Sequence, residues 1–191
     1  MSGTLRVGVV AGVTFTRWRR TWAERFPQPR LDTVAVPKAE QRVALDEARV
    51  DLCFARSPLD PDGLRVIPLY TEVAVVVVPR DHPASLEDSV TLADLAGEEL
   101  LDADGPVDPF DLVAAGQGLL VVPHAVARSS GRRDVVFRPV ADAAPTQVVL
   151  AWHRDREHPA TQDFVGVVRG RSVTSSRGAA AAPPRSRRER R

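Results

Sequence analysis

A glycine and a threonine near the start of the chain have the right setting to bind an anion. Gly12 and Thr14 stand between an apolar run at residues 5–10 and an amphipathic helical pattern that ends at residue 26. Backbone N–H groups are free where a strand passes into a helix, and the helix dipole there favours negative charge. The sequence therefore predicts an anion site made by the N–H groups of Thr14 and Phe15 and the Thr14 hydroxyl. The alternative is that Gly12 serves only the turn and Thr14 only caps the helix.

Arg56 is the second candidate for ligand binding. It follows an apolar run at residues 50–55, which predicts a buried strand whose carboxyl end lies on the same rim as Thr14. A guanidinium group in that place can form a bidentate pair with a carboxylate ligand. The alternative is an internal salt bridge with an acid such as Asp104.

The remaining reactive side chains do not form a catalytic or metal-binding pattern. The four histidines have no nucleophile or metal ligand at a recognisable spacing. Asp102, Asp104 and Asp108 resemble the start of a calcium loop, but no glutamate closes it. Cys53, the single cysteine, lies in an apolar strand, where burial makes a thiol unreactive. We therefore predict no enzyme activity, no metal and no cofactor.

Charge and hydropathy limit the kinds of partner. Residues 171–191 hold seven arginines and one glutamate, a net charge of +6, which leaves −5 for residues 1–170 out of the total of +1. A mildly acidic body argues against specific DNA binding by the folded part. The longest apolar run, residues 73–78, is far shorter than the roughly 20 residues that span a bilayer. No secretory signal is recognisable, so we expect a cytoplasmic protein without a membrane partner.

The order of the predicted elements indicates an α/β fold with two lobes. Strands and helices alternate in the first part of the chain, which is typical of parallel β-α-β units. A polar stretch at residues 80–89 indicates a hinge. Thr91 and Asp94 are predicted to form a capping box for a short helix ending at Gly97.

The predicted division of the chain has four parts. They are a first lobe at 4–79, a second lobe at 80–147, a return strand and last helix on the first lobe at 148–169, and a disordered basic tail at 170–191.

Several segments together resemble the effector-binding domain of LysR-type transcriptional regulators. They occur in the order found in that family and cover nearly all of residues 5–168: LRVGVV, RVDLCF, GLRVIPLY, TEVAVVVVPRDHP, VTLADLAGEELL, LVAAGQGLLVVP, VVFRPV and TQVVLAWHRD. The resemblance implies an α/β fold of the periplasmic-binding-protein type (type II), with a ligand cleft between two lobes.

The chain departs from the family pattern in two places. It begins at the first strand of the effector domain, so the resemblance supplies no N-terminal helix-turn-helix. Only ten residues, 102–111, stand where the family usually carries a further unit of about 30 residues. This predicts a shortened second lobe, and it affects both the cleft wall and the dimer geometry that the family would imply. Across the cleft from Arg56, Asp104 and Gly105 are the expected contributors, with Asp104 either selecting a ligand amine or neutralising Arg56.

Two functions follow from these observations. The first is a non-catalytic sensor that binds a small-molecule effector, such as a carboxylate, and regulates transcription through a partner that carries the DNA-binding element. The second is an interaction module with a vestigial cleft that pairs with full-length regulators. In either case the protein partner is a second copy of this chain or a regulator.

Overall fold

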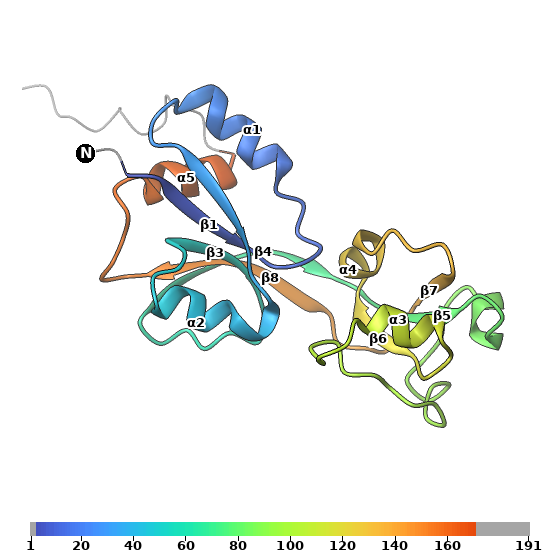
Figure 1. Cartoon of the computed structure of the whole chain (residues 1–191). Coiled ribbons are helices and arrows are strands. Elements are labelled where there is room, and N and C mark those ends of the chain that lie inside the picture. The colour runs from blue at the N-terminus through green and yellow to red at the C-terminus, as the bar shows by residue number, and fades with distance from the viewer. Residues whose placement is uncertain (1–2, 171–191) are drawn as a thin grey trace, which may run out of the picture.

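The computed structural model describes residues 3–170 and consists of two α/β lobes, each built on its own sheet (Figure 1). The first sheet has five strands in the order β2-β1-β3-β8-β4, and the second has three in the order β6-β5-β7. The basic tail predicted from residue 170 onward falls outside the described residues, apart from Gly170 itself.

The first sheet contains the parallel β-α-β units that the sequence indicates. Strands β1 (Leu5–Val9), β2 (Leu31–Ala35) and β3 (Leu52–Arg56) run parallel, with β1 in the middle. Strand β8 (Thr146–His153) runs antiparallel to β3, and β4 (Leu64–Glu72) pairs with β8 at the edge. The register of β4 shifts next to Pro68, because proline has no N–H group for the ladder.

Helices cover both faces of the first sheet. Helices α1 (Thr16–Arg25) and α5 (Thr161–Val168) pack together on one face. A 3₁₀ turn, η1 (Lys38–Glu40), and helix α2 (Gln41–Asp46) cover the other. Successive side chains of a strand point to opposite faces, so every residue of β3 is buried.

Aromatic side chains of α1 form the centre of this lobe. Trp22 is 2% exposed and its ring lies 5.6 Å from that of Phe164 on α5. Trp18 stacks on Phe54 of β3 at 4.7 Å between ring centroids. These contacts fix α1 on the sheet and place the loop before it at the carboxyl ends of β1 and β3.

The second lobe surrounds β5 (Ala74–Pro79), which pairs with β6 (Leu120–Pro123) and β7 (Val135–Pro139). The prediction that this strand belongs to the first lobe was therefore wrong. A run of valines indicates burial but not which sheet the strand joins, and the chain crosses between the lobes at Val73.

Three short helical segments complete the second lobe: η2 (Pro83–Leu86), α3 (Pro109–Ala114) and α4 (His124–Ser129). The segment predicted as a helix at residues 91–97 forms consecutive turns instead. Its capping box is present, because the Thr91 N–H donates to Asp94 Oδ2 at 2.8 Å and the Asp94 N–H donates to Thr91 Oγ1 at 3.3 Å. The box therefore closes a turn that is too short to continue as a helix.

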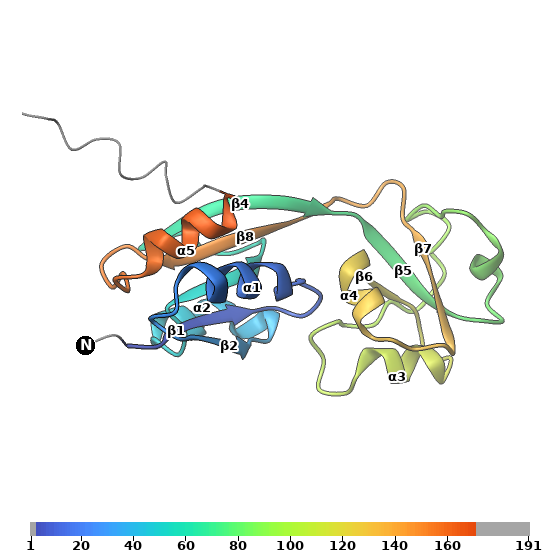
Figure 2. The same ribbon diagram turned by 90° about the horizontal axis from the view of Figure 1, so that it is seen from above.

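Two extended connections join the lobes (Figure 2). One leads from β4 into β5, and the other leads from β7 back to β8. The chain thus returns to the first sheet through β8, and α5 then packs on that lobe.

Candidate functional site

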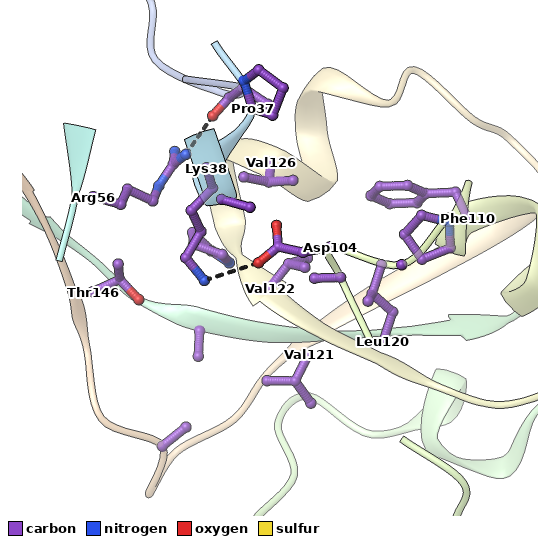
Figure 3. Close-up of a pocket in the computed structure, with 18 of the residues that line it drawn as sticks. Pro37, Lys38, Arg56, Asp104, Phe110, Leu120, Val121, Val122, Val126 and Thr146 are labelled. Carbon is purple, nitrogen blue, oxygen red and sulfur yellow. Dashed lines mark hydrogen bonds and ion pairs between the residues drawn. The ribbon is translucent and has the colours of Figure 1, made fainter. Parts of the chain in front are cut away.

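A cavity of about 510 Å³ lies between the two lobes (Figure 3). This volume is in the range that holds small organic ligands. Both lobes line it, with these residues: Ala11, Pro37, Lys38, Ala39, Arg56, Ser57, Ala74, Ala103, Asp104, Gly105, Pro109, Phe110, Leu120, Val121, Val122, Pro123, Val126, Ala143, Ala144 and Thr146.

The second lobe supplies the apolar wall. Asp108 caps α3 by accepting a hydrogen bond from the Phe110 N–H at 2.9 Å, and this cap fixes the first turn from which the Phe110 ring faces the cavity. Leu120 and Val122 come from β6, and Val126 comes from α4. A wall of this kind favours a ligand with an apolar body and few polar groups.

Arg56 lies at the first-lobe side of the cavity, but its charge is already neutralised. The residue is 2% exposed, and its Nε donates to Glu72 Oε2 at 2.7 Å. Its Nη1 donates to the Ala11 carbonyl, while Nη2 has no hydrogen-bond partner among the described residues. The amide of Gln41 holds the Arg56 backbone through two hydrogen bonds, at 2.9 and 2.7 Å. Arg56 is thus fixed from three sides, and only one of its nitrogens is left for a ligand.

An internal salt bridge with an acid such as Asp104 was the alternative to ligand binding at Arg56, and the structure has this salt bridge with Glu72 and not with Asp104. Glu72 takes that place because β8 lies between β3 and β4 and brings the ends of these two strands together. Asp104 instead faces Lys38, with 3.6 Å between Nζ and Oδ2 (Figure 3). Lys38 begins η1 in the first lobe, so this ion pair spans the cavity.

Lys38 was missed by the sequence reasoning, although the sequence carries a signal. Lys38 is the only lysine in the 191-residue chain, whereas arginine occurs 25 times. Its side chain is 45% exposed, and that of Asp104 is 39% exposed. A charge that stays accessible at a cavity is free to meet a ligand.

The structure divides the predicted site residues into two groups. Arg56, Asp104 and Gly105 line the cavity between the lobes. Gly12, Thr14 and Phe15 line a separate hollow on the first lobe, beside Arg19, Thr33 and Ala35. Phe15 is 7% exposed in the aromatic core, and it occupies the cap position of α1 without a side-chain cap bond. The N–H groups of the loop and the Arg56 guanidinium therefore belong to different hollows.

Gly12 also has a role that needs no ligand. Its φ of +81° is a backbone conformation that favours glycine. A Cβ at this position would lie 2.8 Å from the Val126 nitrogen and 2.9 Å from the Ala125 carbonyl carbon. Gly12 therefore allows the loop after β1 to touch the start of α4, which is a direct contact between the two lobes.

The other candidate groups have structural positions. Burial raises the pKa of the Cys53 thiol to about 12. His82 and His153 form pairs with Glu98 and Asp46. Within residues 3–170 there is no group of three or more histidine, cysteine, aspartate or glutamate side chains placed to hold a metal ion. Over the same range no helix is long and apolar enough to cross a membrane.

Comparisons with known proteins identify relatives that match most of this chain. Among curated proteins, the chain is 26% identical over 183 residues to the Hca operon transcriptional activator HcaR of Escherichia coli (strain K12), covering 79% of this chain and 62% of that protein. It is 20% identical over 198 residues to the HTH-type transcriptional regulator AlsR of Bacillus subtilis (strain 168), covering 86% and 65%. The chain thus spans a little under two thirds of the length of these regulators.

Solved structures agree on the fold. The BenM effector binding domain with its effector benzoate superimposes with a TM-score of 0.72 at 23% identity, covering 87% of this chain and 90% of that chain. Full-length BenM gives a TM-score of 0.71 at 23% identity, covering 88% and 67%. These likenesses confirm the predicted two-lobed fold of the periplasmic-binding-protein type.

The model of the LysR substrate binding domain matches residues 1–107 and 110–172, which is most of the chain. The match is interrupted at residues 108–109, inside the stretch that the sequence indicates as shortened. The chain therefore belongs to the LysR substrate-binding domain family, the non-enzymatic effector-binding part of transcriptional regulators.

Proposed function

We propose that the cavity between the lobes binds a small-molecule effector and that this binding regulates transcription in the cytoplasm. The observation that carries the proposal is the cavity of about 510 Å³ with walls from both lobes. A ligand that contacts both lobes binds more tightly to one lobe arrangement than to others, and it shifts the population toward that arrangement. This shift in lobe arrangement is the signal by which a sensor domain reports that its ligand is bound.

The lining favours an organic acid as the effector. The wall formed by Phe110, Leu120 and Val122 is apolar, and Lys38 offers an accessible ammonium group. The similar effector domain of BenM was solved with benzoate, a small apolar carboxylate. We therefore place a carboxylate effector in this cavity, with Arg56 Nη2 as a further donor at its edge.

The route to DNA lies outside residues 3–170. The relatives HcaR and AlsR are transcriptional regulators that extend well beyond the matched region. We propose that the domain forms a homodimer, or a heterodimer with a regulator, and that a helix-turn-helix element outside residues 3–170 makes the DNA contact. The acidic balance of residues 1–170 supports a DNA contact made elsewhere.

The test is a thermal-shift screen of small organic acids, amides and amines against the purified chain. A ligand at a hundred times its Kd should add about 2.7 kcal/mol of stability, or about 5–11 °C in Tm for a domain of this size. Two variants locate the site, because Ala39 lines the cavity between the lobes and Ala35 lines the first-lobe hollow beside Thr14. Ala39→Trp should abolish the shift, and Ala35→Trp should keep it.

If Ala35→Trp abolishes the shift and Ala39→Trp keeps it, the effector binds in the first-lobe hollow and not between the lobes. If no compound shifts the Tm of the wild type, the interaction-module alternative takes over. Sedimentation with full-length regulators would then measure the pairing that this alternative requires.

A further inference from the structure

The single lysine of this chain stands at the cavity and reaches across it to the other lobe. The chain also has 25 arginines, and within residues 3–170 Arg56 is the only one of them that lines the cavity. Lys38 Nζ lies 3.6 Å from Asp104 Oδ2, and the two side chains point toward each other in Figure 3. Among the lining residues only Lys38, Arg56 and Asp104 carry a charge.

We propose that Lys38 is the residue that selects an anionic effector, and that Asp104 is an internal anion which the effector displaces. This inference rests on the proposed function, because it names the ligand chemistry of the same cavity. The expected ligand is a monoanion: an apolar body against the second-lobe wall and one carboxylate at Lys38.

Arg56 is less suited to this task than Lys38. Its side chain is 3% exposed, and Glu72 already pairs with it at 2.7 Å. A ligand carboxylate there would bring a second negative charge next to Glu72, and the buried pair would have to reorganise. Lys38 has no such constraint, because its ammonium is a compact charge on a flexible stem that can follow a ligand.

The pair of Lys38 and Asp104 is of a kind that a ligand can replace. Both side chains are more than a third exposed, and pairs of this exposure contribute little to stability. A ligand carboxylate backed by the apolar wall is less hydrated than Asp104, which lies in an exposed loop. Displacing Asp104 also removes a link between the lobes, so the arrival of the ligand changes how the lobes are held together.

The chain offers a matched control outside the cavity. Arg49 and Glu40 form an ion pair in the first lobe at 2.8 Å, with side chains 44% and 49% exposed, and neither lines the cavity. Arg49→Met and Glu40→Gln therefore remove the same charges as Lys38→Met and Asp104→Asn, at similar exposure. All four variants should keep the wild-type Tm within a few degrees.

The first experiment is calorimetric titration with benzoate, phenylacetate, salicylate and hexanoate, each beside its own primary amide, and with phenylalanine as a zwitterion. At least one acid should bind the wild type more tightly than its amide. Lys38→Met should weaken that acid tenfold or more and leave the amide within twofold. Lys38→Arg should retain most of the acid affinity, and Asp104→Asn should raise it severalfold. The two control variants should match the wild type.

The second experiment uses the uniqueness of the lysine. Reductive methylation with ¹³C-formaldehyde gives one N-methyl signal for Lys38 and one for the α-amino group, and Lys38→Arg assigns them by removing the first. The Lys38 signal should shift in Asp104→Asn without ligand, should stay in place in Glu40→Gln, and should move when the acid is added but not when its amide is.

The outcomes separate the inference from the function beneath it. Acids that bind the wild type and Lys38→Met equally would overturn the role of Lys38 while leaving the sensor in place. Preferential binding of phenylalanine or of the amides would do the same. A Lys38 signal that is identical in Asp104→Asn and the wild type would overturn the role of Asp104. If no acid, amide or zwitterion binds, both the inference and the cavity as an effector site fail.

Discussion

The two lobes have cores of different size and chemistry. The first lobe buries Trp22 and Trp152, and partly buries Trp18, against a five-stranded sheet that is covered on both faces. The second lobe has a three-stranded sheet, a core made largely of valine and leucine, and helices of six residues or fewer. From this difference we expect the first lobe to be the more stable and more rigid of the two lobes, and the second lobe to be the less stable one.

The two cations that line the cavity differ in burial and in the lobe that they contact. Arg56 belongs to the buried framework of the first lobe, whereas Lys38 is half-exposed and reaches the second lobe. Arg56 therefore stabilises the first lobe, whereas Lys38 is accessible to a ligand.

Truncation of a side chain in the aromatic core of the first lobe should cause the largest loss of stability. Phe164 is fully buried and touches the rings of Phe15, Trp22 and Phe54. Phe164→Ala should lower the free energy of unfolding by about 3–5 kcal/mol, because it leaves a cavity among these rings. Urea denaturation measures this. The control is Leu86→Ala at a side chain that is 88% exposed in the second lobe, which should change stability by about 0.5 kcal/mol or less. Equal losses would remove the distinction between core and wall.

The buried ion pair should behave as framework. Arg56→Met leaves Glu72 as an unpaired buried charge and should cost about 3–5 kcal/mol, a fall of about 6–20 °C in Tm. The double variant Arg56→Met, Glu72→Met should recover much of this loss, because it buries no charge. Thermal unfolding of the single and double variants gives the coupling energy. Arg56→Met with an unchanged Tm and lost acid binding would instead make Arg56 the ligand contact.

Cys53 should report opening of the first lobe only. Its thiol is buried in β3, and burial raises its pKa from 9.0 to about 12, so the reactive thiolate is absent from the folded protein at pH 8. Alkylation by iodoacetamide should therefore be slow in buffer and fast in urea. Because the folded pKa is the higher one, the contribution of this group to stability is complete below pH 9 and is lost as the pH rises toward 12. Rapid alkylation of the native protein at pH 8 would show that the first lobe is not rigid.

The surface carboxyl of Asp134 in the second lobe should make the smallest contribution to stability, and this contribution should change only at acidic pH. Hydrogen bonds from Arg132 lower the pKa of Asp134 from 3.8 to about 2. A lowered carboxyl pKa stabilises the fold above pH 3.8, and this contribution is lost as the pH falls from 3.8 toward 2. NMR titration of the Asp134 carboxyl should show its midpoint near 2. In Arg132→Met the midpoint should return toward the ordinary value, and a midpoint that is already ordinary in the wild type would contradict the pairing.

The sequence was sufficient for the pattern of elements and for the family. Periodic apolar residues located α1 and its buried face, and the order of weak segments led to the fold that the comparisons confirm. It was not sufficient to assign β5 to a sheet, because five consecutive buried residues look the same in either lobe.

The candidate site was only partly predictable, because it depends on pairings between distant segments. Glu72 meets Arg56 only through the position of β8, and Lys38 meets Asp104 only through the facing of the two lobes. Thr14 follows β1 and Arg56 ends the neighbouring strand β3, but the two residues line different hollows. The position of a residue at the end of a strand predicts the edge of the sheet at which it lies, but not the hollow that its side chain lines.

The most direct test of the central claim is a methyl NMR titration of the wild-type chain with an acid found in the thermal-shift screen. Leu120, Val121, Val122 and Val126 line the cavity, while Leu5 and Leu45 lie buried in the first lobe away from it. The methyl signals of the lining residues should shift in a saturable way, and those of Leu5 and Leu45 should stay in place. Shifts confined to the first lobe, or no saturable shift at Leu120 and Val122, would contradict effector binding between the lobes.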